Sequence, residues 1–441
     1  MGRRPTVGIV AGMLLAAAVP SLALAADGNA PPIDSGDTAW MLVSTALVMV
    51  MLPGLALFYG GLVRRKNVLS TIMHSFFGLA LVSVTWVLVG FSLAFAPDAK
   101  LFGIPGLVGG LDFAGFMNVG LTPSAIYGTT IPFVLFAAFQ LMFAAITPAL
   151  ITGAFAERKR FASFVIFTVL WSVLVYSPIA HWVWASDGWL YQLGALDFAG
   201  GTVVHASSGV SALIVALLIG RRVVNGDRME PHDIPMTVLG AGLLWFGWFG
   251  FNAGSALAAN GLAANALLVT NTAAGAATIT WVLASYAHKR KVSVLGAACG
   301  AVAGLVAITP ASGFVTAGGA LIIGFAAGGL CYGATLLRER VKVDDALDVF
   351  AVHGVGGTFG AIATGVFATT LINPLGKGLI DGNPQQVVTQ AFAVGATIAY
   401  AVIATFLIVK VVDLVLGIRV PQREEEVGLD LAVHGEVAYQ T

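Results

Sequence analysis

The stretches DFAGGTVVHASSG, residues 197–209, and DALDVFAVHGVGG, residues 345–357, decide the fold. Each contains a histidine, His205 or His353, at the same interval after an aspartate, and small residues follow. An ionisable side chain at membrane depth is costly, and it usually faces a bundle interior and marks a substrate or proton path. One such histidine alone is also compatible with a simple hydrogen bond to a neighbouring helix. The matched pair instead predicts a transporter built from two repeats, with the path at their interface.

The composition places the chain in a membrane. Of the 441 residues, 58% are hydrophobic and only 10% are charged. No soluble domain of this length is so poor in charge, so the sequence predicts an all-α polytopic membrane protein in contact with a lipid bilayer. The formal net charge is zero and gives no indication of nucleic acid as a partner.

Eleven apolar segments of spanning length follow one another along the chain. They lie at residues 38–62, 68–95, 130–156, 161–182, 202–220, 234–257, 262–287, 295–309, 314–337, 349–371 and 387–415. The first five and the next five segments are each an odd number of membrane crossings. The second half must therefore be inserted in the membrane with the opposite orientation to the first. We therefore expect two inverted five-helix repeats, at about 38–220 and 234–371, and one extra helix. Glycine and alanine spread through the spans favour close helix packing.

The positions of the charges predict the orientation. Cationic clusters occupy every second gap, at residues 64–66, 158–160, 221–228, 289–291, 338–342 and 419–423. By the positive-inside rule these gaps are cytoplasmic, which puts the mature N-terminus outside and the C-terminus inside. Residues 1–25 have the basic, apolar and small-residue parts of a secretory signal peptide, although a first membrane helix is the alternative. The signal peptide predicts the same orientation independently.

The chain therefore divides into a signal peptide at 1–25, an eleven-helix domain at 38–417 and a polar tail at 418–441. From composition alone, such a tail is expected to be a solvated end. Cys299 and Cys331 both lie in apolar segments, so we predict neither a disulfide framework nor a metal site, and no cofactor. An enzyme acting within the membrane would need a nucleophile and base or a metal, and the predicted spans supply neither.

Aromatic residues gather near the outer helix ends. They include Phe139, Phe143, Trp184 and the run WFGWFGFNAGS at 245–255. An interfacial aromatic belt is the plain explanation, but aromatic faces also attract a small cation, by about 2 kcal/mol or more when it is desolvated. Phe139 and Phe143 share one helical face, as do Trp248, Phe251 and Ser255, whose hydroxyl can accept a hydrogen bond.

Between these aromatics and the cytoplasm the predicted path offers mainly apolar groups and two imidazoles. An ion entering it would lose hydration without replacement, whereas a small neutral molecule would not. The chemistry implied is capture of a cation outside, followed by loss of its proton before or during passage.

Several long motifs resemble those of the Amt/Mep/Rh ammonium transporters, in particular the bacterial Amt branch. They are FQLMFAAITPALITGAFAER (139–158), ALDFAGGTVVH (195–205), GWFGFNAGS (247–255), VDDALDVFAVHGVGG (343–357) and GLDLAVHGEVAY (428–439). The resemblance covers essentially the whole mature chain. It implies a homotrimer in the bacterial inner membrane, each subunit with its own eleven-helix pore for ammonium or ammonia.

The resemblance also implies roles for particular residues. The outer ammonium site would comprise Phe143, Trp184 and Ser255 with Phe139 nearby, and Asp197 would be the buried acid that shapes it. Phe143 and Phe251 would stack as a gate, and His205 and His353 would be the twin pore histidines. Gln140 and Trp248 fall on motif positions near the pore and are weaker candidates.

The intact GLD and HGE-AY tail motif implies docking of a trimeric PII-type signalling protein on the cytoplasmic face. The alternative function is an ammonium sensor with little flux that signals through such a partner. Family members that act as sensors are fused to signalling domains, and we expect none in the short tail, which favours transport.

Overall fold

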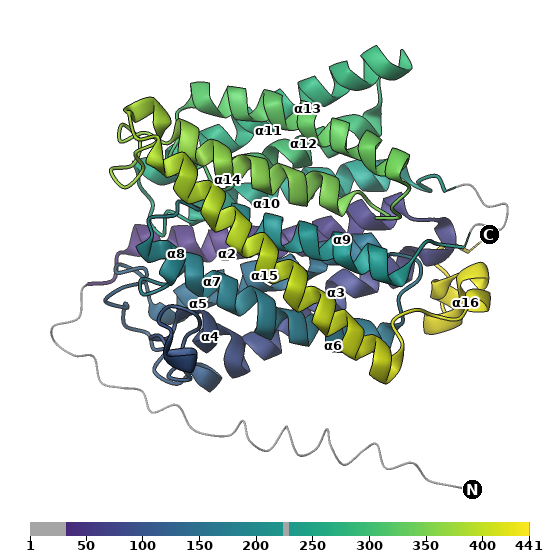
Figure 1. The fold of residues 1–441 in the computed structure, drawn as a ribbon, viewed down its shortest axis with the longest axis horizontal. Coiled ribbons are helices and arrows are strands. Elements are labelled where there is room, and N and C mark those ends of the chain that lie inside the picture. The colour runs from purple at the N-terminus through teal and green to yellow at the C-terminus, as the bar shows by residue number, and fades with distance from the viewer. Residues whose placement is uncertain (1–31, 224–228, 441) are drawn as a thin grey trace, which may run out of the picture.

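The computed structural model describes residues 32–223 and 229–440, and within them every regular element is a helix (Figure 1). The predicted signal peptide at 1–25 lies outside the described residues. The helices run roughly side by side as one bundle, which α15 crosses obliquely.

The first half of the bundle and its outer loops contain α2 (Ser35–Leu62), η2 (Arg65–Asn67), α3 (Val68–Thr85), η3 (Trp86–Gly90), α4 (Phe91–Phe95), η4 (Leu101–Gly103), η5 (Ala114–Phe116), α5 (Phe133–Ile151), η6 (Thr152–Phe155), α6 (Phe161–Trp171), η7 (Ser172–Tyr176), α7 (Ser177–Trp184), α8 (Trp189–Gln192), η8 (Gly201–Ala206) and α9 (Ser207–Ile219). The second half contains α10 (Ile234–Gly254), α11 (Gly261–Lys289), α12 (Val294–Ile308), α13 (Ala317–Val341), η9 (Phe350–Gly354), α14 (Val355–Phe367) and η10 (Leu379–Asp381). Helix α15 (Gln385–Leu416) follows, and α16 (Gln422–Val427) and η11 (Asp430–His434) form the tail.

Ten helices of the described chain are long and apolar enough to cross a membrane. The one remaining predicted segment, 295–309, is present as α12, but this helix has only 15 residues. At 1.5 Å per residue it is about 22 Å long, less than the roughly 30 Å of a bilayer core. The chain stays buried from Thr309 to Val315 after α12 ends, so neighbouring helices cover this short segment. The prediction of an all-α polytopic membrane protein is confirmed.

The first helices of the two halves, α2 and α10, pack closely through glycines. A Cβ atom on Gly240 would lie 2.6 Å from the Gly54 carbonyl oxygen, and one on Gly247 would lie 2.6 Å from the Leu47 carbonyl oxygen. Only glycine allows two backbones to approach so closely. The helices that contact here are the ones that a two-fold axis between the halves would pair.

The fifth helices of the halves pack in the same reciprocal way at the pore. Each begins with a wide π-type turn, η8 or η9, that carries His205 or His353. A Cβ atom on Gly209, four residues after His205, would overlap the backbone of Gly354. A Cβ atom on Gly357, four residues after His353, would lie 2.6 Å from the Cβ atom of His205. This mutual contact agrees with inverted repeats and sets the separation of the two histidines.

A buried ionic network joins both halves at one end of the bundle. Arg64 donates through Nε to Glu157 at 2.8 Å, and Arg222 contacts Glu157 at 3.3 Å and Asp344 at 2.7 Å. Burial alone would raise the pKa of Glu157, but the charges of Arg222 and Arg64 outweigh it and the pKa is lowered. The same competition, with Arg222 as the main partner, lowers the pKa of Asp344 to about 2. Four cation-rich connections therefore meet on one face, as the predicted orientation requires.

The tail packs against this face and is not the solvated end that its composition predicted. The Glu425 side chain is fully buried and accepts hydrogen bonds from Arg419 at 2.5 Å and from the Val223 amide at 3.1 Å. The Asp430 carboxylate accepts from the amides of Leu69 and Ser70, at 3.0 and 2.8 Å. These bonds satisfy free N–H groups at the start of α3, where the helix dipole also favours negative charge.

We predict that Gly357→Val destabilises the protein, because the added side chain must push α14 away from His205. Overpacking of this kind costs about 1–3 kcal/mol. Gly275→Val in α11 is the matched control, since a Cβ atom there meets nothing within 4 Å. Thermal unfolding of the purified variants in detergent measures both effects. Equal stability of the two variants would contradict the proposed close contact at the pore.

Candidate functional site

Aromatic side chains close one end of the space between the two halves. Phe139 and Phe143 lie one turn apart on α5, and their ring centroids are 4.9 Å apart. Trp184 is the last residue of α7, and its ring meets Phe143 edge-on at 5.9 Å and 90°. Ser255 directly follows α10, and the preceding Gly254 lies against the Phe139 ring. The structure thus brings the middle of α5 and the C-terminal ends of α7 and α10 together at the predicted outer site.

The predicted gate residues stack below this site. The rings of Phe143 and Phe251 are 4.2 Å apart between centroids, at 31°. Both side chains are buried. The Ser255 hydroxyl donates to the Phe251 carbonyl at 2.9 Å, which leaves its oxygen lone pairs free to accept from an N–H donor.

Asp197 holds the structure between the outer site and the pore. Its carboxylate accepts from the amides of Gly200, Gly201 and Thr202, each at 2.7 Å, and from the Thr202 hydroxyl. Its own carbonyl accepts from the Trp184 indole at 2.9 Å. The carboxylate therefore starts η8 and the carbonyl orients the tryptophan, and neither contact requires Asp197 to touch a substrate.

Asp345 occupies the matching position in the second half. Its carboxylate accepts from the Phe350 amide at 2.7 Å, at the start of the π-type turn that carries His353. The equal spacing in the sequence therefore corresponds to equal structural roles, since each aspartate starts a histidine-bearing turn.

The two histidines meet in the middle of the bundle. Nδ1 of His205 and Nδ1 of His353 are 3.2 Å apart, which is a hydrogen bond with a single shared proton. The His205 ring also stacks on Trp248 at 5.5 Å and on Phe251 at 6.0 Å. Trp248 in turn is fixed by a 2.9 Å hydrogen bond from its indole to Thr309. A continuous column of rings therefore leads from the gate to the histidine pair.

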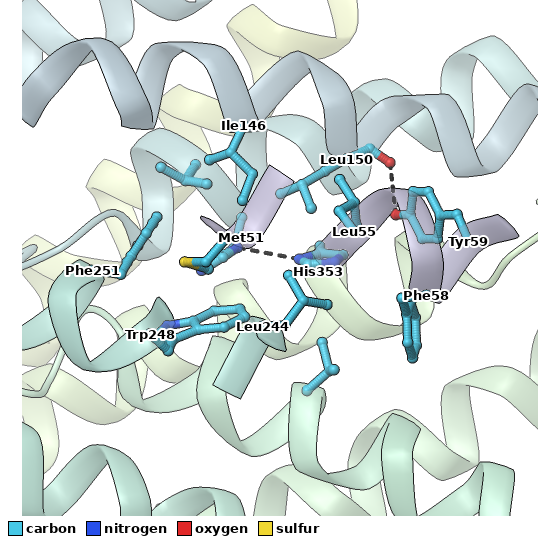
Figure 2. Close-up of a pocket in the computed structure, with 13 residues that line it drawn as sticks. Met51, Leu55, Phe58, Tyr59, Ile146, Leu150, Leu244, Trp248, Phe251 and His353 are labelled. Atoms are coloured by element: carbon cyan, nitrogen blue, oxygen red, sulfur yellow. Dashed lines mark hydrogen bonds between the residues drawn. The ribbon is translucent and has the colours of Figure 1, made fainter. Parts of the chain in front are cut away.

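A narrow cavity surrounds the pair (Figure 2). Its volume is about 10 Å³, so only water-sized molecules fit. Phe251 and Trp248 lie at one end, Tyr59 lies at the other and His353 lies between them. Apart from the two imidazoles, the Tyr59 hydroxyl and the Trp248 indole, the described side chains that line it are hydrocarbon or thioether, and none is charged.

Sequence reasoning missed the contribution of α2 to this cavity. Met51, Leu55, Phe58 and Tyr59 all line it, and the Tyr59 hydroxyl donates to the Leu150 carbonyl at 2.9 Å. These residues carry no distinguishing signal in an apolar helix. Gln140, by contrast, was a predicted candidate, and the structure buries it without placing it in the cavity lining. Trp248 does line the cavity.

The model of the Ammonium Transporter Family matches residues 39–439. An ammonium transporter of Bacillus subtilis (strain 168) is 52% identical over 92% of this chain and 98% of that protein. Ammonium transporter Amt1 of Archaeoglobus fulgidus is 48% identical over 92% of this chain and 100% of that protein.

Solved structures agree with the sequence comparison. The crystal structure of Saccharomyces cerevisiae Mep2 is similar with a TM-score of 0.82 and 37% identity, over 88% of each chain. A structure described as a sensor Amt protein is similar with a TM-score of 0.82 and 29% identity, over 90% of this chain and 98% of that one. The fold is therefore shared by a protein named as a sensor.

Proposed function

The chain belongs to the ammonium transporter family, and from this membership and the pore geometry we propose how it moves its substrate. It captures ammonium at the outer aromatic site, removes a proton and passes ammonia between the two histidines. The observation that carries this proposal is the His205–His353 contact inside a narrow uncharged space, directly below the stacked rings of Phe143 and Phe251.

Recruitment depends on the faces of the aromatic rings. A cation placed by Phe143 and Trp184 is attracted by the ring quadrupoles, and the Ser255 oxygen can accept one of its N–H groups. The ammonium ion must then lose its charge, because the column below the gate offers nothing to replace its hydration. Asp197 positions Trp184 and the histidine turn for this step.

The histidine pair can carry the proton that ammonium releases. When the two neutral rings share one proton between their Nδ1 atoms, one ring has a free Nε2 lone pair and the other has an Nε2–H group. If His205 is the Nδ1 donor, a proton arriving at its Nε2 is followed by transfer of the shared proton to His353. The Nε2 proton of His353 then leaves on the inner side. Ammonia and a proton thus cross by separate steps.

The family relationship makes the chain a multi-pass membrane protein and a transporter, not an enzyme. We further infer a homotrimer in the bacterial inner membrane with the tail in the cytoplasm. The motif resemblance supports the trimer, and the cationic clusters on the tail face support the orientation.

An ammonium sensor with little flux is the second candidate, because a sensor Amt protein has the same fold. The two functions differ in measurable uptake. Cells that lack their own ammonium carriers should regain uptake of labelled methylammonium when they express this chain.

In the same assay, Trp184→Leu keeps the bulk of the side chain but removes most of the attraction of the ring for a cation. Half-saturation of uptake by this variant should therefore require a higher concentration of methylammonium. Background uptake by correctly inserted protein would favour the sensor, and an unchanged half-saturation in the variant would count against the outer site.

The selectivity prediction concerns the uncharged histidine pair. His205→Asp or His353→Glu places a carboxylate in the pore, where it can stabilise a desolvated cation. We expect either variant to conduct potassium as well as ammonium, whereas apolar replacements should lower or abolish the ammonium-driven current. Ammonium and potassium fluxes of each variant in the same vesicles test this. Retention of the original selectivity in both acidic variants would move the discrimination to the phenylalanine gate.

We also propose that a PII-type trimer binds the tail face and blocks the pores. The docked tail supports this proposal, because a protein covering that face would contact the tail and the connections around Arg64 and Arg222 together. Deletion of residues 424–441 should abolish inhibition of uptake when the partner is added to vesicles. Equal inhibition of the truncated and the full-length protein would refute a role for the tail.

A further inference from the structure

A second cavity begins where the histidine column ends. It has a volume of about 350 Å³, enough for several water molecules, and His353 lines both this cavity and the narrow one above it. The wider cavity is also lined by other polar or charged residues, namely Tyr59, Arg222, Cys299, Thr335, Arg338, Glu339 and Asp348. Glu339 is largely exposed, so the cavity leads from buried His353 toward the surface that carries the tail.

Asp348 is placed in this cavity by an unusual backbone. Its φ is 58°, a left-handed conformation that is strained for a non-glycine residue. The Asp348 carbonyl accepts from the Val352 amide at 3.0 Å, which places the residue directly before the turn that carries His353. Its side chain is about one-third exposed, whereas Asp345 is buried.

Arg338 holds the Asp348 carboxylate from the opposite wall. Arg338 Nε in α13 and Asp348 Oδ1 are 2.5 Å apart. The other charged groups that act on Asp348 are Asp345 from its own segment and Glu339 from α13. Burial is the main cause that raises the pKa of Asp348 to about 7. The charge of Arg338 acts to lower this pKa, and the carboxylates of Asp345 and Glu339 act to raise it. By contrast, the carboxylate of Asp344 on the same connection forms an ion pair and hydrogen bonds with Arg222.

We propose that Asp348 accepts the proton that leaves the histidine pair and releases it to the tail side of the membrane, with Arg338 setting its affinity for that proton. This inference rests on the proposed function. The proton leaves His353 Nε2, whose electron pair stays on nitrogen, and passes through water in the cavity to a carboxylate oxygen of Asp348. The resulting O–H bond then breaks, and the proton goes to water outside. The transfer needs no oxidant or other reactant.

The proposal predicts how ammonium-driven current depends on pH at the tail side. Asp348 can accept a proton only when it is ionised, so the current should rise as the pH increases through about 7. Asp348→Asn should lower the current by about a hundredfold, the low end for loss of a proton-transfer group. Neutral ammonia should still alkalinise vesicles that contain this variant. Asp348→Glu should restore the current.

Arg338→Gln separates proton transfer from a structural role. Loss of the guanidinium removes the group that favours the charged carboxylate, so the pH midpoint of the current should move upward. Glu339→Gln is the matched control, because it removes an exposed carboxylate that raises the pKa of Asp348 without bonding to it, so it should move the midpoint slightly downward and not upward. Currents on supported membranes and alkalinisation of vesicles provide the two readouts.

The outcomes distinguish this inference from the function beneath it. Unchanged current and pH profile in Asp348→Asn, with an active unsubstituted protein, would overturn the inference alone. An unsubstituted protein that moves neither charge nor ammonia would overturn the proposed function as well. If Asp348→Asn also loses ammonia conduction, the Arg338→Gln variant provides the deciding test. An unchanged pH midpoint of its current would overturn the role of Asp348 as proton acceptor.

Discussion

A cation that leaves water for an apolar channel loses its hydration, at a cost of several kcal/mol unless other groups replace it. In this protein the space between Phe251 and the far side of His353 offers two neutral rings, one hydroxyl and one indole, and no charge among the described residues. In the proposed function, this desolvation excludes potassium and also favours uncharged imidazoles and an uncharged substrate. The proposed function therefore assigns capture of the cation to the site above Phe143 and Phe251, where ring faces are available.

The rest of the bundle maintains that narrow space. Reciprocal contacts at Gly209 and Gly357 bring the fifth helices of the two halves together, so that the histidines are close enough to share one proton. Asp197 and Asp345 start the turns that carry them. The charged groups are moved to the helix ends, where ionic partners and water satisfy them.

The features that could be predicted from the sequence are those that depend on the length of apolar segments and on ionisable residues that are energetically costly to bury in a membrane. Apolar length located the spanning helices to within a few residues, including α12, and the matched histidines predicted a path at the repeat interface, where the structure brings the two side chains into contact. Hydrophobicity records burial but not the identity of the neighbour, so Met51 and Tyr59 could not be recognised as pore residues. The docking of the tail was missed from composition because it depends on bonds across the whole chain, such as Asp430 to α3. Gln140 was a candidate from its motif position alone, and its side chain is buried outside the lining of the narrow cavity.

The central claim is that the two buried histidines are neutral and share one proton between their Nδ1 atoms. Solid-state NMR of ¹⁵N-histidine-labelled protein in bilayers measures this directly, with His205→Asn and His353→Asn used to assign the signals. The account predicts one Nδ1-protonated and one Nε2-protonated neutral ring at neutral pH. An imidazolium signal from either residue, or two Nε2-protonated rings with no Nδ1 hydrogen, would contradict it.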